Sequence, residues 1–402
     1  MKESNLINKL AIDGGIPVRD KMLPYGRQSL DKKDIEAVVN VLQSDWLTTG
    51  PKVGEFEAAF ADSVGVEEAV VVNSGTAALH AAMYVIGISS GDEVILPAIT
   101  FVATANCVLY QGGIPIFADV YPDTMLIDVT KIESKITSKT KAIIAVDYAG
   151  HPCDYDALRD ICDKYGLILV SDACHSLGAT YKERRVGSLA DVTTFSFHPV
   201  KIITSGEGGM ITCSNPDYAR KMRTFRNHGI TTDHRQRALE GAYLYNMEYL
   251  GFNYRLSDFQ CALGMSQLYK LPSIILDRQL IAQKYDEYFA QINGVSPLNL
   301  LNNVTHAYHL YVVKLDLEYI TMNRTDVFAA LRSENIGVNV HYLPVYQHPF
   351  YQNNTLMLDV VCPIAELEYQ KLLSIPIFPS MSDKDVEDVV VAFKKVLDSY
   401  NN

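Results

Sequence analysis

From Glu68 to Asn227 the sequence alternates between short apolar runs of strand length and segments with helical spacing, and this alternation restricts the possible folds most. Strands that alternate with helices favour a mostly parallel sheet covered by helices on both faces. We expect strands at Glu68–Asn73, Glu93–Ala98, Pro115–Val120, Lys141–Tyr148, Gly166–Ala173, Val192–Phe197 and Met210–Ser214, with helices at Ala77–Ile86, Thr104–Gln111, Asp154–Tyr165 and Pro216–Asn227. In such α/β folds ligands bind beyond the carboxyl ends of the strands.

The flanking segments extend this organisation to two domains and an arm. Residues 1–22 are predicted to be a loosely held N-terminal arm, residues 23–265 a large domain, and residues 266–402 a small C-terminal α/β domain. The expected elements here are helices at Asp34–Gln43, Pro51–Val64, Ser257–Gln291, Arg324–Asn335 and Asp383–Ser399, strands at Ala307–Asp316 and Gly337–Leu343, and a mobile loop at 228–256.

Composition excludes several classes of protein. The net charge of −12 over 402 residues argues against a nucleic-acid-binding protein, because phosphate backbones require a basic face. Seven scattered cysteines without a C-x-x-C pair suggest neither a metal site nor a disulfide framework. We find no signal-peptide core and no run of about 18 apolar residues, so no membrane association is expected. A reduced, cytoplasmic enzyme is the default expectation.

A lysine and an aspartate follow two of the predicted strands. Lys201 lies in a short polar loop after Val192–Phe197, and Asp172 ends the strand within Gly166–Ala173. A lysine deprotonated by its surroundings forms a Schiff base with a carbonyl, and a carboxylate facing a pyridinium nitrogen keeps that ring protonated. A solvated loop lysine and an aspartate that caps a helix are the ordinary alternatives. Together the two residues favour a pyridoxal phosphate site.

A tight turn supplies a candidate phosphate site. Ser74, Gly75 and Thr76 connect a predicted strand to a predicted helix, so backbone N–H groups point outward at a helix start that favours anions. Such joints occur in every α/β protein and are weak evidence alone. Gly75, Phe101, Asp172, Ser196 and Lys201 all follow predicted strands, which predicts that they meet at one edge of the sheet.

The chain resembles a known family through several motifs, which are NSGTAAL, ITFVATAN, SDACHSLGA, FSFHPVK with the GEGG that follows, and GFNYRLSD. These motifs are similar to those of the DegT/DnrJ/EryC1/StrS sugar-nucleotide aminotransferases. The resemblance runs from about Leu23 to Ser399 and implies the pyridoxal phosphate-dependent transferase fold type I, like aspartate aminotransferase. The segments YGRQSLDKKDIEAVV, SDWLTTGP, DYAGHPCD and VHYLPVYQHPFY resemble the branch of this family that serves pseudaminic acid biosynthesis.

This resemblance implies roles for individual residues. Lys201 and Asp172 would be the catalytic pair, and Gly75, Thr76 and Ser196 would hold the cofactor phosphate. Phe101 would stack on the cofactor ring, and His175 would lie near its 3-hydroxyl unless it is only a packed histidine. Asn253 would reach the phosphate of the neighbouring subunit's cofactor, which implies a homodimer with active sites at the interface. The predicted substrate residues are Tyr25, Asp45, Trp46, Leu47, Thr48, His341 and Tyr342, although a Tyr or His beside a strand is more often structural.

The implied reaction transfers the amino group of L-glutamate to C4 of a UDP-linked 4-keto-6-deoxy-N-acetylhexosamine and releases 2-oxoglutarate. Three alternatives stay open on the sequence. Related transaminases act on other nucleotide-linked keto sugars, such as the D-sugar that leads to legionaminic acid, and fold does not fix the substrate. Some relatives dehydrate a sugar at C3 with a histidine in place of the lysine, which Lys201 opposes. The third alternative is a regulatory protein that has lost activity, which the intact Lys201, Asp172 and phosphate turn oppose.

Overall fold

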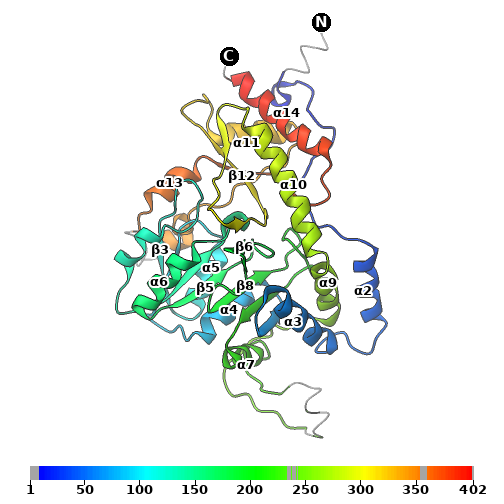
Figure 1. Ribbon diagram of the computed structural model, residues 1–402, viewed down its shortest axis with the longest axis vertical. Helices are drawn as coiled ribbons and strands as arrows, with labels where there is room; N and C mark the ends of the chain where they lie inside the picture. Colours follow the sequence, from blue (N-terminus) through cyan, green and yellow to red (C-terminus); the bar gives the residue numbers. More distant parts are fainter. Residues whose placement is uncertain (1–8, 233–236, 238–240, 242, 354–359, 401–402) are drawn as a thin grey trace.

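The computed structural model describes residues 9–400 except 233–236, 238–240, 242 and 354–359. Its centre is a seven-stranded sheet in the order β1-β9-β8-β5-β4-β2-β3 (Figure 1). The strands are β1 (Glu68–Val72), β2 (Glu93–Pro97), β3 (Ile114–Ala118), β4 (Thr140–Val146), β5 (Ile168–Asp172), β8 (Val192–Ser196) and β9 (Gly209–Cys213). β9 is antiparallel to both of its neighbours and the other pairs are parallel, which confirms the mostly parallel sheet.

Helices connect and cover these strands. They are α2 (Lys32–Leu42), α3 (Pro51–Val64), α4 (Gly75–Val85), α5 (Val102–Tyr110), α6 (Tyr155–Tyr165), α7 (Pro216–Phe225) and α9 (Asp258–Leu268). Local capping sets where they begin. Asp31 and Asp34 form a capping box at the start of α2, and the Asp154 side chain accepts from the Ala157 N–H at the start of α6. The apolar runs of the strands lie in one large core cluster between the helices.

A smaller layer of helices and strands follows α9. It contains α10 (Leu271–Phe289), α11 (Arg324–Ser333), α14 (Asp383–Tyr400) and the three-stranded sheet β10-β12-β13, made of Val295–Pro297, Tyr311–Leu315 and Leu372–Ile375. The remaining α-helices and strands among the described residues are α12 (Pro349–Gln352), α13 (Pro363–Tyr369) and a third sheet of β11 (Val304–Thr305), β6 (Thr180–Tyr181) and β7 (Arg184–Arg185). A second core cluster fills this part, and Leu10 and Leu23 belong to it. The boundaries proposed from the sequence for the two domains stay a prediction.

Three expectations from the sequence differ from this structure, and a fourth falls partly outside the described residues. The single helix expected at Ser257–Gln291 is two helices, and Pro272 is the second residue of the new one. The strand expected at Gly337–Leu343 was wrong, because only Asn339 forms a bridge there, to Ser374 of the unexpected strand β13. The described part of the arm is fastened to α11 and α14, so it is not loosely held. The predicted mobile loop at 228–256 includes residues outside the described ones, and bridges join Ile230 to Met247 and Asn227 to Asn253.

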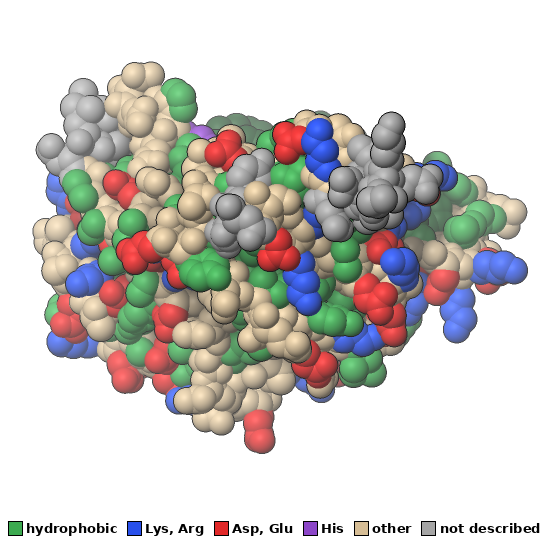
Figure 2. Space-filling model, turned by 90° about the horizontal axis from the view of Figure 1, so that it is seen from above, with side chains coloured by type: hydrophobic (Ala, Val, Ile, Leu, Met, Phe, Trp, Pro, Cys, Tyr) green, Lys and Arg blue, Asp and Glu red, His purple; other side chains and the backbone are tan. Residues whose placement is uncertain are grey.

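The surface carries charges of both signs. On the face shown in Figure 2, acidic and basic side chains are interspersed among apolar ones. No helix within the described ranges is long and apolar enough to cross a membrane. Most of the candidate site residues lie at the edge of the large sheet where its parallel strands end.

Candidate active site

A cavity of about 730 Å³ lies beyond the carboxyl ends of β1, β2, β5 and β8, and segments of the smaller layer close it from the other side. It brings together most of the residues predicted from the sequence, namely Tyr25, Gly75, Thr76, Phe101, Asp172, His175, Ser196, Lys201, His341 and Tyr342. These strands run in the same direction because β9 is antiparallel to both β1 and β8, so their ends meet at one edge. The structure therefore assembles one site from residues far apart in the sequence.

Lys201 follows β8 by five residues, and its backbone N–H donates to the carbonyl of His198 at 2.9 Å. Burial lowers the pKa of the Lys201 amine below its ordinary value, while the nearby Cys174 and Asp172 act in the opposite direction. A lowered pKa increases the fraction of neutral amine, which is the form that attacks a carbonyl or accepts a proton. Lys201 therefore has the environment of a reactive lysine.

Asp172 ends β5 and is buried at the floor of the cavity. Its Oδ2 accepts a hydrogen bond of 2.7 Å from the Thr104 hydroxyl, and its Oδ1 accepts one of 3.2 Å from the Cys174 N–H. The Thr104 hydroxyl also lies 2.8 Å from that of Thr100. Thr104 was missed in the sequence, where it was assigned only as a helix residue in ITFVATAN. A threonine within an Ala-rich first turn is a weak signal that a hydroxyl is required there.

The start of α4 forms the predicted cradle. The Ser74 side chain caps the helix by accepting from the Ala77 N–H at 3.0 Å, which leaves the N–H groups of Gly75 and Thr76 at the open helix end. A Cβ added at Gly75 would lie 2.9 Å from the Ser196 Cβ and 3.2 Å from its hydroxyl. Only glycine leaves this space between the helix start and β8 open, as an incoming phosphate requires.

His175 forms one wall of the cavity. Its Nε2 lies 3.1 Å from the Tyr342 hydroxyl, while its buried Nδ1 has no hydrogen-bond partner among the described residues. Burial and the charge of Lys201 hold the pKa of His175 well below its ordinary value, so the ring is neutral. The ring of His309 lies 4.4 Å from that of His175 and also lines the cavity. His309 was not singled out in the sequence, where it lies within the strand predicted at Ala307–Asp316 and has no distinctive motif.

The adjoining wall, which includes Tyr342, is aromatic. The ring of Tyr25 lies 5.5 Å from that of His341, and the ring of Phe101 lies 5.9 Å from that of Tyr342. Phe101 is 55% exposed, which is unusual for an apolar ring and leaves its face available to a ligand. The backbone carbonyl of His341 accepts a hydrogen bond from the Tyr148 hydroxyl, which fixes this wall to the large sheet.

The predicted residues Asp45, Trp46, Leu47, Thr48 and Asn253 do not line this cavity. Thr48 pairs with Ser257 at the start of α9, and Trp46 lines a separate groove between α2, α3 and α9. The backbone carbonyl of Asn253 accepts a hydrogen bond of 3.3 Å from the side chain of Asn73, the residue before Ser74. Their roles in binding stay predictions.

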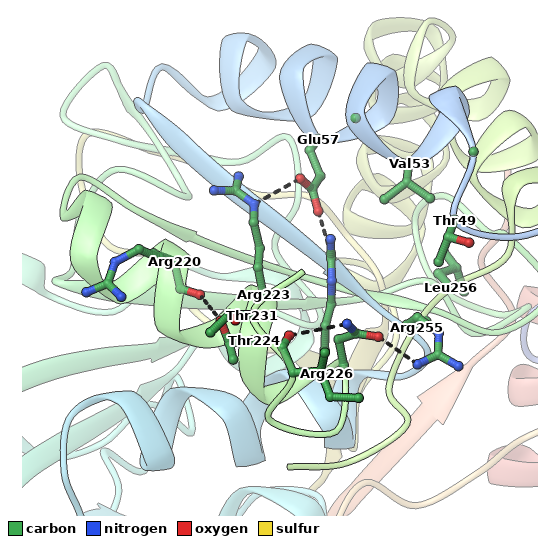
Figure 3. Close-up of a pocket in the computed structure, with 14 residues that line it drawn as sticks. Thr49, Val53, Glu57, Arg220, Arg223, Thr224, Arg226, Thr231, Arg255 and Leu256 are labelled. Atoms are coloured by element: carbon green, nitrogen blue, oxygen red, sulfur yellow. Dashed lines mark hydrogen bonds and ion pairs between the residues drawn. The ribbon is translucent and has the colours of Figure 1, made fainter. Parts of the chain in front are cut away.

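A second cavity of about 390 Å³ opens near these residues, between the start of α3 and α7 (Figure 3). Arg223 and Arg226 both pair with the Glu57 carboxylate there. Arg255 instead donates to the Asn227 side-chain oxygen at 2.9 Å. Figure 3 shows Arg223 and Arg226 beside Glu57, and Arg255 pointing away from them. The lining is basic because it also includes Arg220 and has Glu57 as its acidic residue. The described residues contain no group of three His, Cys, Asp or Glu side chains that could hold a metal ion.

The Lys201 cavity fits pyridoxal phosphate on its own geometry. It offers an amine of lowered pKa, a buried carboxylate, a glycine cradle at a helix start, and an unpartnered His175 nitrogen for a hydroxyl group. These are the groups that hold an aldehyde, a ring nitrogen, a phosphate and a phenolic oxygen. No part of this cavity conflicts with that cofactor.

Comparison with known proteins agrees with this geometry. Residues 28–394 match the model of the DegT/DnrJ/EryC1/StrS aminotransferase family. The spore coat polysaccharide biosynthesis protein SpsC of Bacillus subtilis is 39% identical over 381 residues, which cover 94% of this chain and 98% of SpsC. PseC of Helicobacter pylori, an aminotransferase involved in the biosynthesis of pseudoaminic acid, superposes with a TM-score of 0.89 at 33% identity and covers 94% of this chain and 100% of its own.

A putative sugar aminotransferase of Streptococcus pneumoniae, Spr1654, has been solved in a pyridoxal phosphate form and a pyridoxamine phosphate form. The latter superposes with a TM-score of 0.87 at 32% identity and covers 94% of this chain and 99% of its own. The chain belongs to the DegT/DnrJ/EryC1/StrS aminotransferase family and is a pyridoxal phosphate-dependent sugar-nucleotide transaminase of fold type I.

Proposed function

We propose that this enzyme transfers the amino group of L-glutamate to C4 of a UDP-linked 2-acetamido-2,6-dideoxy-hexos-4-ulose. The product would be UDP-4-amino-4,6-dideoxy-N-acetyl-β-L-altrosamine, a precursor of pseudaminic acid, and the by-product 2-oxoglutarate. The likeness to PseC over 94% of this chain is the observation that carries the choice of substrate. The aromatic wall formed by Tyr25, His341 and Tyr342 supports it, because such rings suit a uracil base and a 6-deoxysugar methyl group.

Each residue of the cavity would have a separate role in the reaction. When bound, pyridoxal phosphate supplies an electron sink that stabilises negative charge beside the reacting carbon. Lys201 would first hold the cofactor and then, once released, carry the proton between the substrate carbon and the cofactor. The Asp172 carboxylate would hold the ring nitrogen in its protonated form, and Thr104 would orient that carboxylate through its 2.7 Å hydrogen bond. His175 is neutral, so it would position the phenolic oxygen without adding charge.

A related substrate is the alternative. SpsC is more similar in sequence than PseC, at 39% against 33% identity, and is named for spore coat polysaccharide. A legionaminic-type D-sugar, or a dTDP- or GDP-linked keto sugar, would use the same Lys201 chemistry with a different fit to the aromatic wall. Substrate choice therefore depends on residues outside the cofactor site.

Absorbance spectroscopy distinguishes the proposed substrate from the alternative nucleotide sugars. L-glutamate should bleach the cofactor band of the purified holoenzyme, and the correct keto sugar should restore it. We expect the UDP-linked L-arabino-configured 4-keto sugar to restore the band faster than the D-xylo epimer or dTDP- and GDP-linked keto sugars. Restoration by one of the others alone would replace the proposed substrate while leaving the transaminase intact. A Lys201→Ala control should show no recovery with any sugar.

We also propose a homodimer in which Asn253 reaches the cofactor phosphate of the neighbouring subunit. The exposed position of Asn253 outside its own cavity supports this arrangement. Mixing inactive Lys201→Ala subunits with Asn253→Ala subunits provides a test. If sites are shared, some mixed dimers contain one site with neither substitution and regain activity. If each chain forms its site alone, mixing restores nothing.

The proposed cellular location is the cytoplasm. The seven cysteines are all free, and six of them are buried, so no disulfide framework depends on an oxidising compartment. Subcellular fractionation of a tagged chain, with activity measured in each fraction, tests this location. Recovery of the activity outside the cytoplasmic fraction would reject it.

A further inference from the structure

Glu334 fastens the described part of the N-terminal arm to the smaller layer of the fold. Its side chain is fully buried at the end of α11. Oε1 accepts the Ala11 N–H at 2.8 Å, and Oε2 accepts the Val18 N–H at 2.9 Å. A buried carboxylate requires such partners, because an unpaired charge in the interior is strongly unfavourable. The carboxylate therefore depends on the arm for two of its hydrogen bonds.

Lys395 of α14 completes this contact. Its ammonium group lies 2.9 Å from Glu334 Oε2 and donates to the Ile16 carbonyl at 2.7 Å. Removing one partner of a buried ion pair leaves the other charge uncompensated. The arm, α11 and α14 are thus joined by one network rather than by separate surface contacts.

Further along the arm, Arg19 also joins the arm to α14 through ion pairs. Its guanidinium pairs with Asp385 at 2.9 Å and with Asp388, both on α14. The Asn335 side chain donates to the Arg19 carbonyl at 2.7 Å. In Figure 1 the N-terminal segment accordingly follows α14 before it descends toward α2. Residues 9–23 are therefore held over most of their length.

The arm leads directly into the active-site wall. The Leu23 N–H donates to the Asn335 carbonyl at 3.0 Å, and the Gly337 N–H donates to the Leu23 carbonyl at 2.7 Å. A Cβ at Gly337 would lie 2.5 Å from the Leu23 carbonyl oxygen and 3.1 Å from the Tyr25 nitrogen, so the two backbones touch. Two residues later, the Tyr25 carbonyl accepts the Ile377 N–H at 3.1 Å.

Two segments of the chain form this wall, and both begin at the backbone contact between Leu23 and Gly337. Tyr25 follows Leu23 on one segment, and His341 follows Gly337 on the other, with their rings 5.5 Å apart in the Lys201 cavity. A displacement of the arm would move Tyr25 relative to His341. It would not displace β5, which carries Asp172, or β8, which leads to Lys201. The arm can thus alter one wall of the cavity while the cofactor residues stay in place.

We propose that residues 9–23 are a positioning segment for the sugar-nucleotide site. Glu334 and the Leu23–Gly337 contact set the place of Tyr25, and thereby the KM for the nucleotide sugar. This inference rests on the proposed role of Tyr25 in binding that substrate. The glutamate half-reaction takes place at Lys201 with a much smaller substrate, so it does not depend on the arm.

Two variants disturb the arm without replacing a residue that lines the cavity. Gly337→Ala forces the Leu23 backbone away, and Arg19→Ala removes the two ion pairs and leaves the buried core unchanged. For Gly337→Ala we expect the KM for the keto sugar to rise about tenfold and the rate of the glutamate half-reaction to change by less than about twofold. Gly54→Ala is the matched control, because its Cβ would meet nothing within 4 Å. Arg19→Ala should show the same pattern with a smaller rise.

A double-mutant cycle with Tyr25→Ala decides whether the arm acts through Tyr25. If it does, Tyr25→Ala alone raises KM, and adding Gly337→Ala or Arg19→Ala raises it no further. Additive effects, an unchanged KM in Tyr25→Ala, or an equal loss in both half-reactions would overturn the inference. Wild-type turnover of the UDP-linked keto sugar reports separately on the proposed function, and the cycle is measured with whichever nucleotide sugar the wild type accepts.

Discussion

Replacing Thr104 with valine should remove a hydrogen bond to the Asp172 carboxylate while keeping the shape of the site. Thr104 is fully buried, and valine has nearly the same volume, so packing is retained. The substitution removes the 2.7 Å hydrogen bond to Asp172 Oδ2 and leaves the carboxylate with the 3.2 Å bond from the Cys174 N–H. In the proposed mechanism the charged carboxylate pairs with the cofactor ring nitrogen, and the substitution removes one of the hydrogen bonds that stabilise this charged form.

The expected loss follows from the type of bond. A hydrogen bond to a charged group contributes about 1.5–3 kcal/mol. If the whole contribution is lost at the transition state, the glutamate half-reaction slows by about 10- to 150-fold. Single-turnover absorbance measurements with saturating cofactor give this rate directly, and a cofactor titration gives the accompanying change in affinity.

Two neighbouring substitutions serve as controls. Thr104→Ser keeps the hydroxyl and should stay within about threefold of the wild-type rate. Thr100→Val removes the hydroxyl that lies 2.8 Å from that of Thr104 but leaves the bond to Asp172, so its effect should be intermediate. A Thr104→Val enzyme with the wild-type rate and cofactor affinity would refute the assigned role of this hydroxyl.

Three other predictions concern the cofactor and stability. Lys201→Ala should bind pyridoxal phosphate only non-covalently, seen as loss of the cofactor band on gel filtration, and should lack turnover; normal turnover would remove Lys201 from the mechanism. Gly75→Ala places a Cβ 2.9 Å from the Ser196 Cβ, so cofactor affinity should fall about tenfold or more in a titration, whereas Gly54→Ala should bind normally. Burial lowers the pKa of His151 to about 4, so its contribution to stability is complete above pH 6.5 and is lost as the pH falls toward 4, at up to about 1.4 kcal/mol per pH unit. Chemical denaturation of a His151→Gln variant should show a smaller loss over that range, and an unchanged slope would contradict the buried neutral ring.

The sequence predicted the large sheet and the clustering of most candidate cofactor residues in one cavity, because local patterns determine both. Apolar runs bounded by glycines and capping residues identify buried strands and helix starts, and each parallel strand delivers its next polar residue to the same edge. Lys201, Asp172 and Gly75 each follow such a run, so their meeting could be anticipated.

The rest of the site depends on contacts that no local pattern encodes. The apolar residues at Gly337–Leu343 indicated a strand, yet the segment packs against the arm and only Asn339 pairs with Ser374. The residues Asp45–Thr48 were carried over from the resemblance, and in the single chain they lie against α9. Thr104 and His309 act on other side chains rather than standing at strand ends, so their positions became evident only in three dimensions.

The contact between Tyr25 and Ile377 also bears on how the enzyme is made. A chain growing on the ribosome exposes Tyr25 early, but its backbone partners at Asn335, Gly337 and Ile377 are synthesised more than 300 residues later. The sheet that carries Asp172 and leads to Lys201 is complete once Cys213 has emerged. The nascent chain can therefore build the floor of the cavity long before its aromatic wall, which is completed only after Ile377 has emerged.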